Sequence, residues 1–184
     1  MSIFLRYVAV ITTILIFSNG CSVIKMINLK SKNEPVAKEV LIFSPGDVIN
    51  GLKLQTDYEI CRDLVCLASL IDGAAPYYIS NGSTDILFCD FKNSSLDNGV
   101  SVEIYKTSNY SYAKTFFDDS SSLSPVNINI EGNPAKIDEG LIGTYRIETY
   151  KQNYFIRVMT SEKDEESKKE LIKFVEVVFR AIPD

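Results

Sequence analysis

Cysteine is the residue type with the most distinctive chemistry in this chain, because the 184 residues include four cysteines and no histidine. Cys61 ends an expected strand and Cys66 falls in the first turn of an expected helix. The chain reversal between them can bring their Cα atoms within the roughly 4.4 to 6.8 Å that a disulfide requires. We therefore predict a Cys61–Cys66 disulfide. Cys89 lies in an apolar, strand-like segment and is expected to be a buried thiol.

A thiol-based redox function is the alternative interpretation of these cysteines. The Cys-x4-Cys spacing differs from the Cys-x-x-Cys motif of thiol oxidoreductases. Arg62 is the only basic neighbour that could lower a thiol pKa. We therefore favour a structural role for the sulfur atoms.

The absence of histidine excludes Ser-His-Asp triads, Cys-His nucleophile pairs and zinc sites that contain histidine. The 24 acidic residues outnumber the 19 basic residues, and the formal net charge is −5. A surface that neutralises phosphates needs the opposite balance, so nucleic acid is not an expected partner. The pattern of residues also predicts neither a metal site nor a cofactor.

A broken helix in the middle of the chain is the second place where chemistry could occur. Apolar residues recur at helical spacing from Leu64, but Gly73 and Pro76 interrupt the pattern. A helix that stops and restarts leaves backbone N–H groups free, and tyrosines offer apolar rings with polar tips. The candidate binding residues are therefore Asp72, Gly73, Tyr77 and Tyr78. The alternative is that Gly73 permits close packing and both tyrosines are half-buried helix residues.

The N-terminus has the pattern of an export signal. An apolar run of ten residues from Val8 to Phe17 is too short to span a bilayer, which needs about 20 apolar residues. The small residues before Cys21 resemble the lipobox of bacterial lipoproteins, in which the cysteine is acylated and becomes the first residue. Lipoboxes usually carry Leu, Val or Ile where this chain has Ser18. The alternative is an uncleaved anchor in which Cys21 has no role.

The lipobox resemblance implies a domain organisation and an address. Residues 1–20 are the expected signal peptide, residues 21–45 a lipid-anchored tether, and residues 46–184 a single domain. Ser22 is not the aspartate that retains such proteins at an inner membrane. The resemblance therefore implies a cell-envelope location, at the outer membrane or cell surface of a bacterium, with the membrane as partner through the lipid.

The remaining pattern predicts an α+β fold, with an antiparallel sheet, helices packed largely on one face and a long C-terminal helix. Tight spacing between successive strands favours antiparallel neighbours. The expected strands cover residues 58–61, 84–91, 100–106, 126–130, 136–138, 144–150 and 154–159. The expected helices are the broken helix from 64 to 81, a short helix after Ser108 or Asn109, and a helix over 162–182.

The expected C-terminal helix has one apolar and one charged side. Its apolar stripe consists of Leu171, Val175, Val178 and Ile182. We expect this stripe to cover the strand pair over residues 144–159. Asp164 and Lys168 are expected to form an i,i+4 pair on the wet side.

A resemblance covers about residues 51–182. The stretch Leu67–Phe91, LASLIDGAAPYYISNGSTDILFCDF, resembles the motif L-x-x-x-I-N-G-A-A-E-L-Y-L-x-x-G-F of a bacterial family of unknown function. VEIYKTSNYSYAKTFF and EGLIGTYRIETYKQNYFIRV are similar to the next two segments of that family, in the same order. Asp72 and Pro76 depart from the motif. The resemblance implies an exported α+β domain without an assigned activity, and the architecture is similar to the PsbP fold.

The sequence therefore favours an exported, lipid-anchored protein that binds or scaffolds, with a protein partner in the envelope, rather than a catalyst. The alternative is an enzyme of an unrecognised type or a thiol-based redox protein. An enzyme would bring Asp72, Tyr78, Cys66 and a further carboxylate into one pocket.

Overall fold

The computed structural model describes residues 43–44, 46–55, 58–93 and 99–183. The expected signal peptide, Cys21 and the tether up to residue 42 lie outside these residues. Within the described ranges, no helix combines the length and apolarity needed to cross a bilayer.

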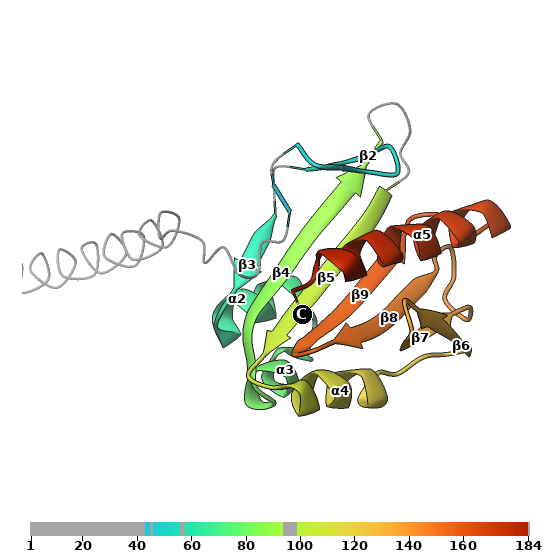
Figure 1. Ribbon diagram of the computed structural model, residues 1–184. Helices are drawn as coiled ribbons and strands as arrows, with labels where there is room; N and C mark the ends of the chain where they lie inside the picture. The colour runs from blue at the N-terminus through green and yellow to red at the C-terminus, as the bar shows by residue number, and fades with distance from the viewer. Residues whose placement is uncertain (1–42, 45, 56–57, 94–98, 184) are drawn as a thin grey trace, which may run out of the picture. The chain divides into compact units, whose positions relative to one another are not determined.

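One antiparallel sheet of nine strands organises the described residues (Figure 1). Its order is β1-β2-β4-β5-β9-β8-β7-β6, and β3 also pairs with β4. The strands are β1 Val48–Ile49, β2 Leu52–Leu54, β3 Glu59–Cys61, β4 Ser83–Lys92, β5 Gly99–Thr107, β6 Pro125–Ile130, β7 Asn133–Asp138, β8 Arg146–Lys151 and β9 Tyr154–Thr160. The described helices are α2 Leu64–Leu70, α3 Ala75–Ser80, α4 Tyr110–Asp119 and α5 Glu165–Ala181.

Helix boundaries follow the capping residues in the sequence. The side chains of Asp63, Asn109 and Asp164 accept hydrogen bonds from first-turn N–H groups of α2, α4 and α5. The predicted break is confirmed, because α2 ends before Gly73 and α3 restarts with Pro76 in its first turn.

The two faces of the sheet carry separate apolar clusters, because successive strand residues point to opposite faces. On one face, Val102, Ile104, Ile156 and Val158 pack with residues of α5. On the other face, Tyr105 and Phe155 pack with residues of α2, α3 and α4. The α+β class is confirmed. Three of the described helices share one face, and the long C-terminal helix lies across the opposite face (Figure 1).

The contact predicted for the C-terminal helix is confirmed. Val175 and Val178 are fully buried, and they belong to the same cluster as Ile147 and Val158 of the β8–β9 pair. An aromatic chain extends this cluster towards the N-terminus of the described residues. Phe91 makes edge contacts at 5.1 Å between ring centroids with both Phe43 and Phe174.

Candidate ligand-binding cleft and the predicted site residues

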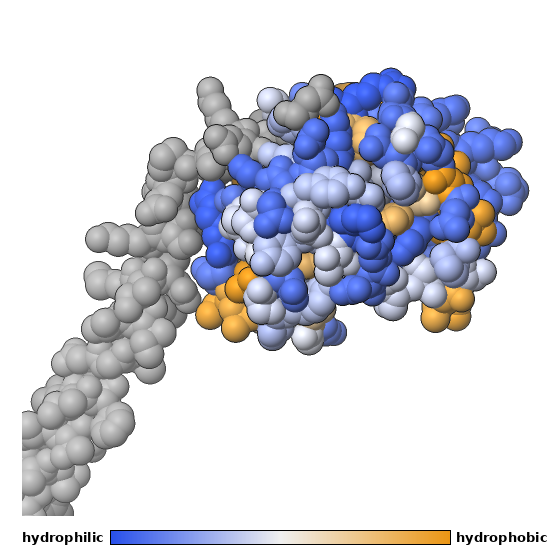
Figure 2. All heavy atoms as spheres, turned by 60° about the horizontal axis from the view of Figure 1, so that its bottom comes forward, coloured by the Kyte–Doolittle hydropathy of each residue, from blue (hydrophilic) through white to orange (hydrophobic). Residues whose placement is uncertain are grey.

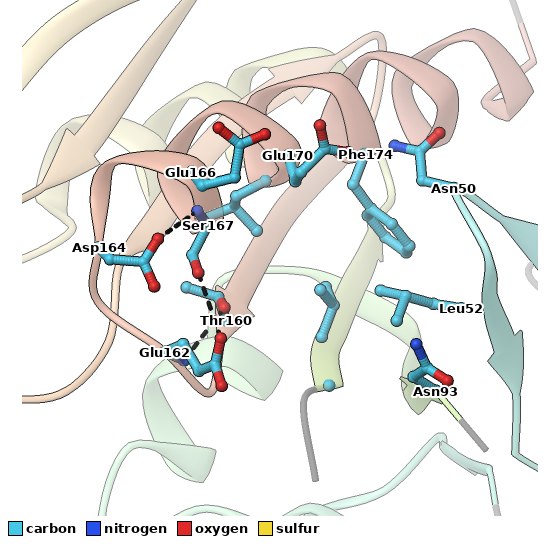
Figure 3. A pocket seen from close by; sticks show the side chains of 13 residues that line it. Asn50, Leu52, Asn93, Thr160, Glu162, Asp164, Glu166, Ser167, Glu170 and Phe174 are labelled. Atoms are coloured by element: carbon cyan, nitrogen blue, oxygen red, sulfur yellow. Dashed lines mark hydrogen bonds between the residues drawn. The ribbon is translucent and has the colours of Figure 1, made fainter. Parts of the chain in front are cut away.

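A cleft of about 310 Å³ lies between the first turns of α5, the neighbouring ends of β5 and β9, and β2 (Figure 3). This volume is at the lower end of the range of small-molecule sites. The lining residues are Asn50, Leu52, Asn93, Gly99, Val100, Thr160, Glu162, Asp164, Glu166, Ser167, Glu170, Leu171 and Phe174.

The apolar part of the cleft belongs to the hydrophobic core. Phe174 and Leu171 are each 1% exposed, and Val100 is 6% exposed. The contact between Phe174 and Phe91 holds the Phe174 ring against the sheet. Leu52 contributes a partly buried side chain from β2. The apolar wall is therefore rigid, because core packing fixes the side chains that form it.

Four carboxylates form the polar rim of the cleft, and α5 with its preceding loop supplies all of them: Glu162, Asp164, Glu166 and Glu170 (Figure 3). Asp164 accepts the Ser167 backbone N–H at 2.8 Å, and the Ser167 hydroxyl donates to Glu162 at 3.4 Å. The Ser167 donors hold the pKa of Asp164 below its usual range, so this carboxylate stays ionised at neutral pH.

Nearby lysines offset only part of this negative charge. Lys173 pairs with Glu170 at 2.7 Å, and Lys169 approaches Glu166 at 4.0 Å. Within the described part of the chain, no lysine or arginine lines the cleft or lies within ion-pair distance of Glu162 or Asp164. The N-terminus of α5 adds roughly half a positive charge. The rim therefore remains negative, and the cleft suits a cationic group attached to an apolar body.

The residues predicted to bind a ligand are not grouped around this cleft. Asp72 and Gly73 are exposed in the link between α2 and α3. The Tyr77 hydroxyl donates to Asp119 at 2.7 Å, and Tyr78 is buried at 8% exposure. The rings of Tyr77 and Tyr78 contact each other with centroids 5.3 Å apart, and both belong to the apolar cluster on the face of the sheet opposite α5. None of the four lines the cleft.

The Tyr78 hydroxyl belongs instead to a buried ionic cluster between α3 and the sheet. Arg157 donates to Glu103 at 2.9 Å, to Glu148 at 2.8 Å and to the Tyr78 hydroxyl at 3.1 Å. Burial disfavours the arginine charge, but Glu103 and the other neighbouring groups outweigh this effect and raise the pKa of Arg157. The cluster therefore fixes α3 on the sheet.

The ionic cluster continues across the sheet to β7. Arg146 contacts Asp138 at 3.1 Å and Glu148 at 3.5 Å. Burial acts to raise the pKa of Asp138, but three backbone N–H donors and Arg146 outweigh it and hold this pKa below its usual range. The three donors belong to Ser124, Gly140 and Leu123. Asp138 thus ties the loop before β6 to the end of β7.

The three cysteines of the described residues lie on β3, α2 and β4. Cys61 and Cys66 form a disulfide with Cα atoms 5.4 Å apart. The Glu59 carboxylate lies within 4.8 Å of both sulfur atoms, but the sulfurs are bonded to each other and do not act as thiolate ligands in this state. Cys89 is free and buried, and burial raises its pKa to about 12. This thiol is a poor nucleophile at neutral pH, because little thiolate is present.

The sequence signal for the cleft was limited to its rim. The acidic cluster Glu162–Glu166 is visible in the sequence, but helix-dipole stabilisation explains such a cluster equally well. The apolar wall combines β2, β5 and α5, which are distant in sequence. An enzyme was expected to bring Asp72, Tyr78 and Cys66 together in one pocket. None of these three residues lines the cleft.

No protein-family model matches the chain, and no curated protein matches it either. Among solved structures, the extracellular domain of PknH from Mycobacterium tuberculosis is similar, with 13% sequence identity and a TM-score of 0.43. The match covers 71% of this chain and 86% of that chain. A similarity at this level carries no argument about function.

Proposed function

We propose that this protein is an exported, lipid-anchored domain that binds a partner or ligand through the cleft between α5 and the sheet. The bound group combines a positive charge with an apolar body. The observation that carries the proposal is the combination of a rigid apolar wall with a carboxylate rim that retains excess negative charge.

The sequence and the disulfide support the exported and anchored part of the proposal. A short apolar run followed by small residues and Cys21 is typical of a lipoprotein signal. Disulfides such as Cys61–Cys66 persist in oxidising compartments outside the cytosol. We propose the cell envelope as the location, and membership of the family of unknown function that the motif at Leu67–Phe91 resembles.

Three probes of equal length and different charge test the binding function. Hexylammonium, hexanoate and hexanol are titrated separately into the full-length protein labelled with ¹⁵N, and backbone amide shifts are followed by NMR. We expect hexylammonium to shift the amides of cleft residues such as Leu171 and Phe174 at lower concentrations than the other probes. Hexanoate should bind weakest, because the carboxylate rim repels it.

Two single variants distinguish the effect of the rim carboxylates on binding from the effect of negative charge elsewhere on the surface. Glu162→Gln should weaken hexylammonium binding, because Glu162 lacks a described cationic partner. Glu176→Gln, farther along α5 and outside the cleft lining, is the matched control and should leave binding unchanged. Equal binding of hexylammonium and hexanoate, or shifts located away from the cleft, would overturn the proposal.

A further inference from the structure

Strand β6 is the last strand on one side of the sheet. It pairs with β7 from Pro125 opposite Asp138 to Ile130 opposite Asn133. Within the described ranges, no strand pairs with its other side. Figure 1 shows β6 at the outer end of the sheet, beyond β7.

The turn after β6 determines which backbone groups point outward. Glu131 and Gly132 link β6 to β7, and both have positive φ angles, 50° and 84°. A two-residue turn of this kind makes the flanking pair, Ile130 and Asn133, a hydrogen-bonded pair. Hydrogen-bonded and non-hydrogen-bonded pairs alternate along an antiparallel ladder. The N–H and C=O groups of Asn127 and Asn129 therefore point away from β7, towards the open side.

Pro134 agrees with this assignment. It lies opposite Asn129, in a pair that exchanges no hydrogen bonds, so its missing N–H leaves no gap between β6 and β7.

The open side of β6 lacks the usual protection against strand pairing. Natural edge strands carry charged side chains, internal prolines or bulges that prevent another strand from adding. The β6 sequence PVNINI has no charged residue, its proline stands at the first position, and its register with β7 is regular. Val126 is 41% exposed. This edge can accept another strand.

We propose that the β6 edge pairs antiparallel with β6 of a second copy, around a two-fold axis at Ile128. In this register Asn127 lies opposite Asn129 of the second copy, and the outward groups of these residues form four backbone hydrogen bonds. Ile128 then lies opposite Ile128 of the second copy, and Val126 lies opposite Ile130. Two sheets join into one.

The self-complementary sequence is the reason for choosing a second copy as the occupant. An isologous interface requires one surface to match itself. The antiparallel register places apolar residues opposite apolar residues and asparagine opposite asparagine, and no like charges face each other within β6. Two copies of this acidic chain can therefore meet along β6 without a charged side chain of one strand facing a charged side chain of the other.

Single cysteine substitutions test the register. At the two-fold axis, Ile128→Cys forms a non-hydrogen-bonded pair with its own copy, with Cα atoms about 4.5 Å apart, which lies within disulfide range. Val126→Cys is the control, because its two copies lie about 13 Å apart when four residues separate them at 3.3 Å each. The full-length variants are oxidised with copper–phenanthroline and separated on non-reducing gels, and the wild-type chain gives the background from its own cysteines.

We expect Ile128→Cys to form covalent dimers roughly tenfold faster than Val126→Cys, because pairing raises the effective concentration of the two thiols. Equal rates would overturn the proposal, since random collision favours the more exposed position 126. Asn127→Pro added to Ile128→Cys should remove the crosslink, because it deletes an outward N–H and no β6–β7 hydrogen bond.

Sedimentation equilibrium of unmodified full-length protein gives a result independent of cysteine variants and their folding. A concentration-dependent dimer that Asn127→Pro abolishes supports the pairing. A monomer at every concentration, or a dimer that Asn127→Pro leaves intact, overturns it.

Discussion

Arg157 of β9 donates a hydrogen bond from Nε to Oε1 of Glu148 on β8, at 2.8 Å, beneath α3. The Glu148 side chain is 1% exposed, and its second oxygen Oε2 is buried without a described hydrogen-bond partner. Arg157 therefore supplies the shorter of the two ion pairs of Glu148, since Arg146 lies at 3.5 Å, and it also pairs with Glu103.

Replacing this arginine should destabilise the domain strongly. Arg157→Met would remove the arginine from Glu103 and leave Glu148 with Arg146 alone at 3.5 Å, and breaking a buried ion pair in this way typically costs about 3–5 kcal/mol. Arg62→Met is the matched control, because Arg62 pairs with Asp85 at the surface and such pairs contribute about 0–1 kcal/mol. Urea unfolding monitored by circular dichroism measures the free energy of unfolding of both variants. Equal stabilities of the two variants would show that Arg157 is dispensable.

Asp138 should make stability depend on acid pH. Its folded-state pKa lies below the unfolded value, near 3.9, so its contribution is fully present above about pH 4. That contribution is lost as the pH falls through the folded pKa. Asp138→Asn should therefore lower Tm at pH 7, and its difference from wild type should narrow at lower pH. Glu166→Gln, at an exposed site, is the control. A constant difference at all pH values would contradict this expectation.

The contact between α5 and the sheet should be essential for folding. Val175→Asp places an unpaired charge at a fully buried position, and the expected loss of several kcal/mol compares with a total stability of about 5–15 kcal/mol. Lys169→Ala, on the exposed side of the same helix, should cost less than about 0.5 kcal/mol. Thermal unfolding distinguishes them. A Val175→Asp protein that melts within a degree or two of wild type would mean that α5 is not packed on the sheet.

The sulfur atoms should differ in their reactivity. Alkylation of the exported protein without reductant should label Cys89 only after denaturation, and mass mapping should find Cys61 joined to Cys66. Replacing both of these cysteines with alanine should lower stability by about 2 kcal/mol, because the loop that they close is short. Free Cys61 and Cys66 in exported protein, or a bridged Cys89, would contradict the assignment.

We expect membrane anchoring to depend on Cys21, which lies outside the described residues. Cys21→Ser should abolish metabolic labelling with palmitate and leave an unprocessed, slower-migrating precursor in a bacterial host. Cys89→Ser should keep both labelling and processing. If Cys21→Ser is labelled as strongly as wild type, the lipoprotein interpretation is wrong.

Local sequence signals predicted the elements well where their physical cause is local. Asp63 caps α2 because its side chain reaches the Cys66 N–H, and Asn109 does the same for α4 at Tyr112. Along β5, the alternate apolar residues Val102 and Ile104 share one face of the sheet, as the period of a strand requires. Helix capping and strand alternation involve residues only a few positions apart, so they can be recognised in the sequence before the fold is known.

Expectations that depend on distant partners were less successful. Lys168 was expected to pair with Asp164, but its ammonium group contacts Glu139, while Asp164 caps α5. Tyr112 lies one helical turn before the buried Phe116 of α4, yet Tyr112 is 37% exposed. Helical spacing identifies which residues share a face, but neighbouring elements decide how much of that face is covered.

The sequence by itself determined the α+β class, the apolar stripe of α5 and the spacing that lets Cys61 meet Cys66. These features depend on periodicity and short-range geometry. Only the tertiary structure decided that α5 covers the face opposite α2, α3 and α4, that Tyr78 meets Arg157, and that Phe174 forms a cleft wall with Leu52 and Val100. The physical reason is that strand order and register bring these residues together, and both emerge from the packing of the whole sheet.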